Sequence, residues 1–301
     1  MDGAPSVVVV GGTSFVGSHL LPRLADAHAV AATYRTGPPP GMAGVQWVKS
    51  DLAEADPTRG WPSHCDSVVY LAQSRRWRSV PDGAADVFDV NIRAVFAAAE
   101  YARRAGASRF VFASSGSIYD ATDDGPLRES ALHDVRTRRQ FYGVSKLAAE
   151  LILNAYAAWM SIIILRLFVP YGRGQSDDML MPQLLRKVTA GEALQLDGDQ
   201  GLRLNPVAVG DAAETFARCL RLDETTTMNV AGPEVLTLRQ IGEHIGRAVG
   251  REPRFEVRDV PARSLVADTS LLSDRLQWRP QRSFAAGLQE WLAAPAPSDA
   301  S

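Results

Sequence analysis

The chain has 301 residues, of which 46% are hydrophobic, so it is long enough to bury a large core in one domain or in a domain with an added lobe. Its 32 basic and 34 acidic residues give a net charge of -2, which excludes a general electrostatic attraction for nucleic acid or an anionic membrane. Two distant cysteines, Cys65 and Cys219, and five scattered histidines form no zinc or disulfide pattern, so we expect no metal.

The N-terminal sequence and the apolar segments predict a soluble, cytoplasmic protein. MDGAPSVVVVGG begins with an acidic residue and runs directly into a strand, without the basic and apolar regions of a signal peptide. The longest apolar run, near residues 162–169, contains Arg166 and is too short to cross a bilayer.

The first two thirds of the chain alternate between short apolar runs and helical patterns. The predicted strands are Val7–Val10, Ala29–Arg35, Val45–Lys49, Ser67–Ala72, Arg109–Ser114 and Ser161–Phe168. The predicted helices between them are Phe15–Ala27, Ala84–Ala105 and Gln140–Met160. This rhythm predicts an α/β fold of the Rossmann type, with a doubly wound parallel sheet.

The rhythm loosens after Val169. We expect helices at Met179–Ala190, Leu238–Val249 and Phe284–Leu292, and strands at Leu204–Val209, Thr227–Ala231 and Arg254–Val257. The predicted domains are a Rossmann domain of residues 1–170 with about 204–232, and a smaller, mostly helical substrate lobe of about 171–203 with 233–293. Residues 294–301, rich in Pro, Ala and Ser, are expected to be a flexible tail.

A glycine loop follows the first strand and opens the first helix, at Gly11-Gly12-Thr13-Ser14-Phe15-Val16-Gly17. A helix N-terminus beside a buried strand offers free backbone N–H groups and the positive end of the helix dipole to a pyrophosphate. Gly11 permits the tight turn, and Gly17 permits close packing of helix and strand. The position of the loop therefore predicts a dinucleotide site.

Two polar residues at strand ends bear on the choice of cofactor. Arg35 ends the second strand, where it can pair with a 2′-phosphate, and this favours NADP(H) while leaving NAD(H) possible. Asp51 follows the third strand, where its carboxylate can meet the adenine amine or cap an ordinary turn. Both readings of Asp51 stay open.

Tyr142 and Lys146 stand four residues apart in a predicted helix and share one face. A phenol is a poor proton carrier at neutral pH, and we expect the neighbouring ammonium to lower its pKa. Tyr142 then exchanges a proton with a carbonyl or alcohol. Ser114 and Ser115 end the strand before this helix, at the edge where parallel sheets bind ligands, and Ser115 is positioned to bond the reacting oxygen.

Together these residues resemble the extended short-chain dehydrogenase/reductases, in particular the NAD-dependent epimerase/dehydratase family that acts on nucleotide sugars. The resemblance covers nearly the whole chain. Besides the motifs above, it includes Tyr70-Leu71-Ala72, Asn91, Arg166-Leu167-Phe168, Tyr171-Gly172, Asn205-Pro206-Val207, Asn229-Val230-Ala231-Gly232 and Leu276-Gln277-Trp278-Arg279-Pro280.

The resemblance implies specific roles for residues of this chain. Dinucleotide contacts are implied or expected at Gly11, Thr13, Ser14, Phe15, Val16, Gly17, Arg35, Asp51, Leu52, Leu71, Ala72, Gln73, Asn91, Ser114, Tyr142, Lys146 and Phe168. Ser115, Tyr142 and Lys146 form the catalytic set. Substrate contacts are expected at Ser74, Ser117, Val169 and Arg203, the last facing a diphosphate.

The chain departs from the family pattern at several positions. Ser14 replaces the usual middle glycine, and Val169 stands where asparagine is common in proteins that hold sugar nucleotides. Ala208 and Gly210 occur where polar residues are common. Gly116-Ser117 replace the Asp-Glu pair of the 4,6-dehydratases, and we therefore set dehydration aside.

An arginine-rich segment, Ser74-Arg75-Arg76-Trp77-Arg78, follows the fourth strand at the ligand edge. Its arginines can bind a substrate phosphate and its tryptophan can stack on a ring. A solvated loop is an equal alternative.

The sequence favours an NADPH-dependent reductase of a nucleotide-activated keto-sugar, with Tyr142 supplying the proton. The first alternative is an NAD-dependent nucleotide-sugar epimerase, and the second is a non-catalytic NAD(P)-sensing regulator. The Ala-rich helices at 84–105 and 140–160 also make a homodimer plausible, as in the family.

Overall fold

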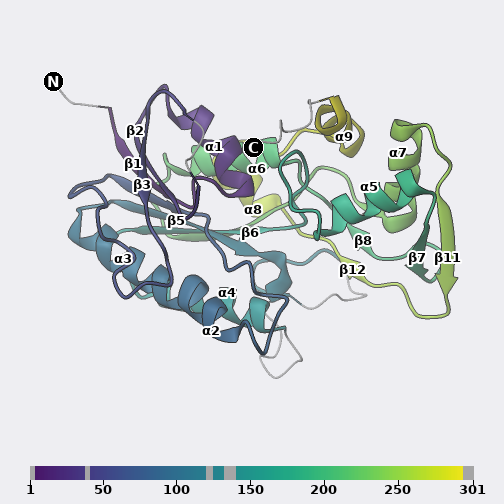
Figure 1. Ribbon diagram of the computed structural model, residues 1–301, viewed down its shortest axis with the longest axis horizontal. Coiled ribbons are helices and arrows are strands. Elements are labelled where there is room, and N and C mark those ends of the chain that lie inside the picture. The colour runs from purple at the N-terminus through teal and green to yellow at the C-terminus, as the bar shows by residue number, and fades with distance from the viewer. Residues whose placement is uncertain (1–3, 38–40, 120–124, 132–139, 294–301) are drawn as a thin grey trace. The chain divides into compact units, whose positions relative to one another are not determined.

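The computed structural model describes residues 4–37, 41–119, 125–131 and 140–293, and its main feature is a seven-stranded sheet (Figure 1). The strands are β1 (Ser6–Val10), β2 (Ala29–Tyr34), β3 (Val45–Lys49), β4 (Ser67–Tyr70), β5 (Arg109–Ser115), β6 (Ser161–Leu167) and β9 (Thr226–Val230). Their order is β3-β2-β1-β4-β5-β6-β9, and β1 pairs in parallel with both β2 and β4. The chain reverses its direction of winding at β1, so a ligand crevice is expected at the carboxyl ends of β1 and β4.

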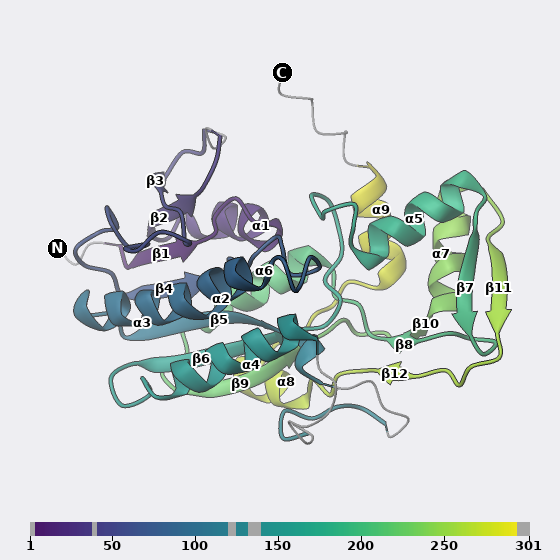
Figure 2. The ribbon, with the colours of Figure 1, turned by 60° about the horizontal axis from the view of Figure 1, so that its bottom comes forward.

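Helices cover both faces of this sheet. They are α1 (Phe15–Leu24), α2 (Ala84–Phe88), α3 (Ala94–Arg104), α4 (Phe141–Asn154) and α6 (Val209–Cys219). Figures 1 and 2 place α1 and α6 on one face and α2, α3 and α4 on the other. The predicted doubly wound Rossmann fold is therefore confirmed.

The helix predicted over 84–105 is interrupted. A π-helical turn, η1 (Asp89–Arg93), separates α2 from α3. Such turns insert an extra residue in the helical ladder and occur often at functional sites. This one contains Asn91, a residue expected at the site. A short 3-10 helix, η2 (Gly116–Ile118), follows β5.

The buried core around the sheet matches the sequence patterns of its strands and helices. The side chains of Val7–Val10 are at most 2% exposed, as expected for a strand covered on both faces. Phe110 and Phe112 of β5 are fully buried and pack with alanines of α3 such as Ala98. The small alanine side chains let α3 lie close to the sheet. The large aromatic side chains of β5 fill the space between the helix and the sheet.

The chain divides into two compact units. The first consists of Met1–Tyr119, Leu132–Arg166 and Ala213–Met228, and the second of Asp120–Ala131, Leu167–Ala212 and Asn229–Ser301. These boundaries differ in places from the sequence-based domains, which stay a prediction. The expected tail, 294–301, lies outside the described residues.

The second unit combines helices with small sheets. Its elements are α5 (Leu180–Ala190), β7 (Ala193–Asp197), β8 (Arg203–Leu204), β10 (Leu236–Thr237), α7 (Leu238–Val249), β11 (Arg254–Arg258), β12 (Ser264–Leu265), α8 (Ser270–Leu276) and α9 (Phe284–Ala293). One sheet has the order β10-β8-β12, and β11 pairs with β7. Its separate core includes Tyr171, Leu184, Ile241 and Phe284.

The strand predicted at Leu204–Val209 is wrong. Strand β8 ends at Leu204, and α6 begins at Val209. Pro206 has no N–H to give to a sheet, and Asn205 uses its side-chain amide to pair with the backbone of Ala267. The apolar run is buried, as its composition indicates, but in a loop between two elements.

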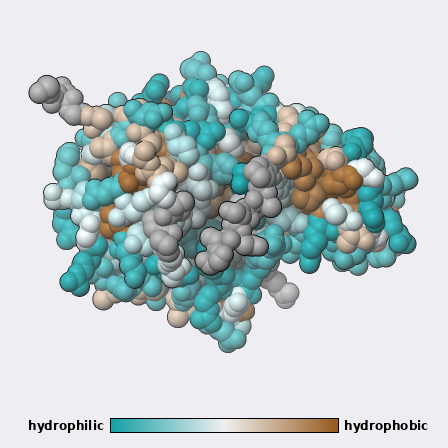
Figure 3. Space-filling model, turned by 45° about the horizontal axis from the view of Figure 1, so that its top comes forward, coloured by the Kyte–Doolittle hydropathy of each residue, from teal (hydrophilic) through white to brown (hydrophobic). Residues whose placement is uncertain are grey.

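Membrane-spanning helices and metal clusters are not features of the described residues. Among the described residues, no helix has both the length and the apolar character needed to span a bilayer, and no three His, Cys, Asp or Glu side chains gather as a metal site. The face shown in Figure 3 is largely hydrophilic, with hydrophobic residues confined to separate areas.

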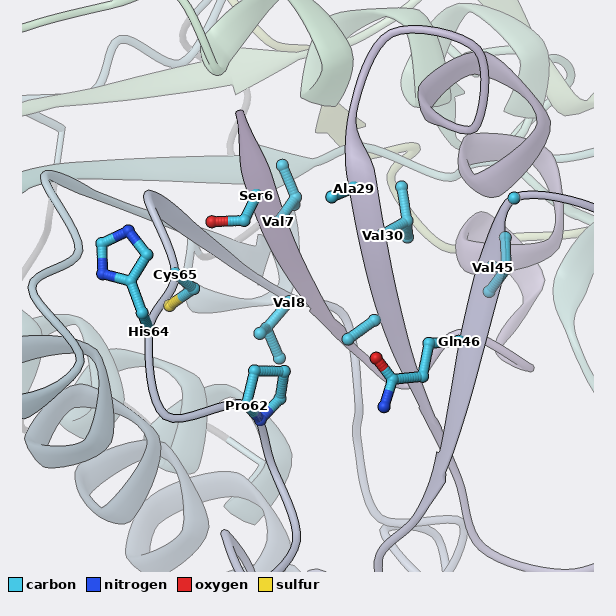
Figure 4. A pocket seen from close by; sticks show the side chains of 12 residues that line it. Ser6, Val7, Val8, Ala29, Val30, Val45, Gln46, Pro62, His64 and Cys65 are labelled. Atoms are coloured by element: carbon cyan, nitrogen blue, oxygen red, sulfur yellow. The ribbon is translucent and has the colours of Figure 1, made fainter. Parts of the chain in front are cut away.

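A cavity of about 520 Å³ opens at the amino ends of β1, β2 and β3 (Figure 4). Ser6, Ala29 and Val45, the first residues of these strands, line it together with Pro62 and His64. Because the glycine loop follows the carboxyl end of β1, this cavity lies at the opposite end of the strands from the predicted dinucleotide site.

Candidate active site

The glycine loop, Gly11–Ser14, joins β1 to α1 in a very tight space. Gly11 has φ +85°, and a Cβ there would lie 2.9 Å from the backbone nitrogen of Ala72. A Cβ on Gly17 would lie 2.5 Å from the carbonyl oxygen of Gly11. Only glycine permits this backbone conformation and these close approaches without displacement of the main chain.

The N-terminus of α1 has the features of an anion-binding site. Ser14 is the N-cap residue, and its hydroxyl accepts a hydrogen bond of 3.2 Å from the Gly17 N–H. Within the described residues, the structure records no partner for the backbone N–H groups of Phe15 and Val16. These two donors and the helix dipole fit a diphosphate group. The serine that departs from the family pattern thus has a structural role as the cap.

Thr33 of β2 positions the loop, a role that the sequence patterns did not reveal. Its hydroxyl accepts from the Gly11 N–H at 2.9 Å, and its carbonyl accepts from the Gly12 N–H at 2.9 Å. Thr33 is 3% exposed, so these bonds are shielded from water. The loop is therefore held by strand β2 as well as by its own glycines.

The residues expected at the adenosine end lie at the ends of β2 and β3. Arg35 is exposed directly after β2. Asp51 accepts a 3.0 Å bond from the Ala53 N–H, so one carboxylate oxygen caps a turn. Its second oxygen has no partner recorded among residues 4–37, 41–119, 125–131 and 140–293. Leu52 is buried beside it.

Tyr142 is the second residue of α4 and stands beside the end of β5. Gly143 makes this possible, because a Cβ there would lie 2.5 Å from the Ser117 carbonyl oxygen. Ser115 accepts bonds from the Ser117 N–H at 3.1 Å and from the Ser117 hydroxyl at 3.0 Å. The structure thus brings the predicted catalytic serine and tyrosine together through a glycine contact.

The Tyr142 hydroxyl donates a 2.8 Å hydrogen bond to Oε1 of Gln73. Burial raises the pKa of Tyr142 to about 12, against a lowering effect of the Ser115 hydroxyl. The expectation that Lys146 lowers this pKa is therefore wrong here. The phenol holds its proton at neutral pH.

The burial of Lys146 explains why this residue does not lower the pKa of Tyr142. Lys146 is 2% exposed, and its Nζ donates a 2.9 Å hydrogen bond to the Ala113 carbonyl. The same Nζ lies 5.9 Å from the centre of the Tyr142 ring. Burial lowers the pKa of Lys146 to about 7, although Glu150 opposes this shift. An amine that is charged only part of the time is a weak source of positive potential for the phenol.

A buried ionic network lies behind these residues. Glu150 accepts bonds from Arg166 Nε at 3.1 Å and from Arg166 Nη2 at 2.7 Å, and also from the Ser114 hydroxyl. Arg166 Nη1 donates to the Tyr119 hydroxyl at 2.6 Å. This network ties α4 to β5 and β6. Ser114, expected at the cofactor, uses its hydroxyl here.

Asn91 and Ser74 also bond to protein groups. Asn91 Oδ1 accepts from the Ser74 N–H at 2.9 Å, and its Nδ2 donates to the Ser145 hydroxyl at 3.0 Å. The Ser145 hydroxyl donates to the Tyr142 carbonyl at 2.7 Å. The Ser74 hydroxyl donates to Asp86, and Ser74 is 2% exposed. This placement favours an anchoring role for Ser74 over contact with substrate.

The arginine-rich segment after β4 reaches the tyrosine. The Trp77 ring lies 5.0 Å from the Tyr142 ring at an angle of 39°, and the Arg78 guanidinium lies 4.2 Å from the centre of the Trp77 ring. Arg75 and Arg76 are exposed. The sequence placed this segment at the ligand edge but did not indicate its contact with Tyr142.

The remaining expected residues lie at the end of β4 and in the second unit. The Leu71 N–H donates to the Val10 carbonyl at 2.9 Å, and Ala72 faces Gly11. In the second unit, Phe168 is buried and Arg203 is exposed on β8. Val169 has φ +42°, which is strained for a β-branched residue.

Comparisons with known proteins match nearly the whole chain. A model of the NAD dependent epimerase/dehydratase family matches residues 7–231. A dTDP-4-dehydro-6-deoxy-D-allose reductase from a Streptomyces species is 28% identical, over 95% of this chain and 94% of the relative. A UDP-glucose 4-epimerase from Streptomyces lividans is 27% identical, over 92% of both chains. The solved structure of MoeE5 in complex with UDP-glucuronic acid and NAD has 26% identity and a TM-score of 0.79, over 95% of this chain and 98% of that one.

Proposed function

Since this chain belongs to the NAD dependent epimerase/dehydratase family, we propose that it is an NADPH-dependent reductase of a nucleotide-activated keto-sugar. The sequence-based resemblance is confirmed, and the protein is an NAD(P)-dependent enzyme of the extended short-chain dehydrogenase/reductase type. A relative of nearly equal length is named as a reductase of a dTDP-4-dehydro-6-deoxy sugar.

The phenol of Tyr142, placed beside Ser115 with a hydroxyl that donates to Gln73, supports the proposal for reduction together with the relative named as a reductase. Its pKa of about 12 keeps the proton on the phenol at neutral pH. Reduction of a ketone needs a proton donor at the carbonyl oxygen, which this phenol supplies, while Ser115 beside it bonds the same oxygen. The nicotinamide supplies the hydride.

The proposed cofactor contacts begin at the glycine loop. The N–H groups of Phe15 and Val16 bind the diphosphate, and Arg35 pairs with a 2′-phosphate. Asp51 has one carboxylate oxygen left for the adenine amine. Lys146 holds the nicotinamide ribose. The other proposed contacts are those expected from the sequence, including Leu71, Ala72 and Phe168.

The proposed substrate is a nucleotide sugar. Arg203 is exposed and has no ion pair in the described part of the chain, so its guanidinium is available for a diphosphate. Ser117 lies next to Ser115 and faces the reacting sugar in this proposal. Val169 contacts the sugar in place of the amide that the family commonly has there.

We also propose a homodimer through α2, α3 and α4. These helices expose Phe88, Phe96, Val144 and Leu151, each at least 47% exposed. Large apolar side chains gathered on adjacent helices mark surfaces that pair with another protein.

Net consumption of cofactor separates the proposal from its alternative. The purified protein is incubated with NADPH or NADH and a panel of keto-sugar nucleotides, and absorbance of the reduced cofactor is followed. We expect stoichiometric oxidation of NADPH, faster than of NADH. The UDP-glucose 4-epimerase among the relatives supports an epimerase as second candidate. Interconversion of UDP-sugars without net loss of NADPH overturns the reductase in its favour.

A further inference from the structure

Two side chains from the segment after β4 contact Tyr142, one at its hydroxyl and one at its ring. Gln73 accepts the hydrogen bond of the phenol hydroxyl at 2.8 Å. Trp77 places its ring 5.0 Å from the phenol ring. Neither residue belongs to the Ser–Tyr–Lys set. Together the two contacts constrain both the hydroxyl direction and the ring plane.

The segment that presents these side chains is itself anchored to the tyrosine's helix. Ser74 follows Gln73, and its N–H is held by Asn91, whose amide in turn bonds Ser145 of α4. The Ser74 hydroxyl bonds Asp86 of α2 and accepts from the Arg76 N–H at 3.0 Å. The tight hydrogen-bonded path from Ser74 to Ser145 fixes Gln73 relative to Tyr142.

Packing fixes the far side of the segment as well. A Cβ on Gly83 would lie 2.4 Å from the Arg76 carbonyl oxygen, so the start of α2 lies directly against the segment. The Arg78 guanidinium covers the Trp77 ring at 4.2 Å. Trp77 is thereby held between an arginine and the catalytic tyrosine, an arrangement that aromatic and cation–π contacts stabilise.

We propose that Gln73 and Trp77 are positioning residues for Tyr142, Gln73 by holding the hydroxyl with its proton on the tyrosine and Trp77 by holding the plane of the ring. The proposal rests on the proposed role of Tyr142 as proton donor. An acceptor such as the Gln73 carbonyl bonds only the protonated phenol, and so it favours the acid form. Among the described residues of the first unit, the other groups that face Tyr142 are Ser115 and Lys146, and Arg78 lies beyond Trp77.

The test measures the ionisation of Tyr142 directly. The full-length protein is labelled with ¹³Cζ-tyrosine, the Tyr142 resonance is assigned by its loss in Tyr142→Phe, and the signal is followed from pH 7 to 12, where the wild type should reach about half ionisation. Gln73→Met keeps the side-chain length and removes the acceptor, and we expect its Tyr142 pKa to fall by about one pH unit. In Gln73→Glu the added carboxylate opposes ionisation, so Tyr142 of this variant should stay protonated at pH 12, where the wild type is about half ionised. Ser79→Ala, which lies on the same segment, is exposed and changes no charge, is the control and should match the wild type.

Trp77 is tested by kinetics. Trp77→Phe retains an aromatic face and should keep most of the activity. Trp77→Ala should lower kcat about tenfold with a smaller change in KM, because a misplaced proton donor slows the chemical step. Equal kcat in Trp77→Ala and wild type, with a lower melting temperature alone, contradicts the role of Trp77.

The two proposals fail separately. An unchanged Tyr142 titration in both Gln73 variants overturns the role of Gln73, and so does a raised pKa in Gln73→Met, because it would mean that the amide donates to the phenol. If the titration shifts as expected but no keto-sugar is reduced, the proposed function fails and the contact stands. If keto-sugars are reduced and the titration does not shift, only the positioning role fails.

Discussion

The glycine loop and the surroundings of Tyr142 lie at the same edge of the sheet but are built in different ways. The loop is formed by the backbone of seven consecutive residues. Gly11 and Gly17 permit its conformation and its close contacts. The surroundings of Tyr142 are made by side chains from the segment after β4 and from β5, β6 and α4, which meet only in the fold. The glycine loop can be recognised from a local sequence pattern. The surroundings of Tyr142 cannot, because only the topology of the fold brings those side chains together.

The largest predicted effect tests the side-chain assembly. Arg166→Met leaves Glu150 buried without its cation, and we expect a loss of about 3–5 kcal/mol in the free energy of unfolding. Replacing both residues, in Arg166→Met/Glu150→Leu, should recover most of this loss. Denaturant unfolding measures it. Arg103→Met, which breaks the exposed pair with Glu100, is the control and should cost less than about 1 kcal/mol. Similar losses from both single variants would show that the buried network is not special.

The next effect tests the backbone packing of the glycine loop. Gly17→Ala places a Cβ against the carbonyl oxygens of Gly11 and Gly12, at 2.5 and 2.6 Å, and should destabilise the protein by about 1–3 kcal/mol. Displacement of the loop should also weaken NADPH binding, as measured by fluorescence titration. Gly41→Ala, where nothing lies within 4 Å, is the matched control. Unaltered cofactor affinity in Gly17→Ala would refute the close-packed loop.

The buried lysine gives a pH dependence that sharpens the comparison. The pKa of Lys146 is lowered from 10.5 to about 7 in the folded chain, so between these values the unfolded chain binds more protons. Stability should therefore rise with pH in this window, by about 2 kcal/mol from pH 7 to 9, relative to Lys146→Met. Below pH 7 both states hold the proton, and the two proteins should respond alike. Parallel curves for both proteins from pH 7 to 9 would contradict a buried, largely uncharged amine.

The smallest predicted effect concerns Val169 in the second unit. Its φ of +42° is unfavourable for a β-branched residue and more acceptable for asparagine, so Val169→Asn should stabilise the protein by about 1 kcal/mol. Thermal unfolding measures this. The control is Val235→Asn, at an exposed position without positive φ, which should give no gain. If the two variants have equal stability, the backbone at Val169 is not strained.

Much of this architecture is readable in the sequence, for physical reasons. Buried β-branched runs such as Val7–Val10 and the helical spacing between them predict the parallel sheet, and the glycine loop predicts the dinucleotide end. Tyr142 and Lys146 share a face because four residues make about one helical turn. These features depend on neighbours in the chain.

The unpredicted features depend on partners far along the chain. Gln73 and Tyr142 are separated by 69 positions, and Ser114 and Glu150 by 36, so no local pattern marks their pairing. The apolar character of the run after Leu204 predicts a strand, whereas β8 ends at Leu204, before Pro206. The lowered pKa that the sequence predicts for Tyr142 is wrong because the spacing of Tyr142 and Lys146 does not indicate that Lys146 is buried.

The central claim is that the Tyr142 hydroxyl delivers the proton during reduction of a keto-sugar. It is tested most directly by the single-turnover rate of NADPH oxidation in Tyr142→Phe, with a keto-sugar nucleotide that the wild type reduces. We predict a rate about 10²- to 10⁴-fold lower, with unchanged NADPH affinity. A rate within about threefold of the wild type would contradict the claim.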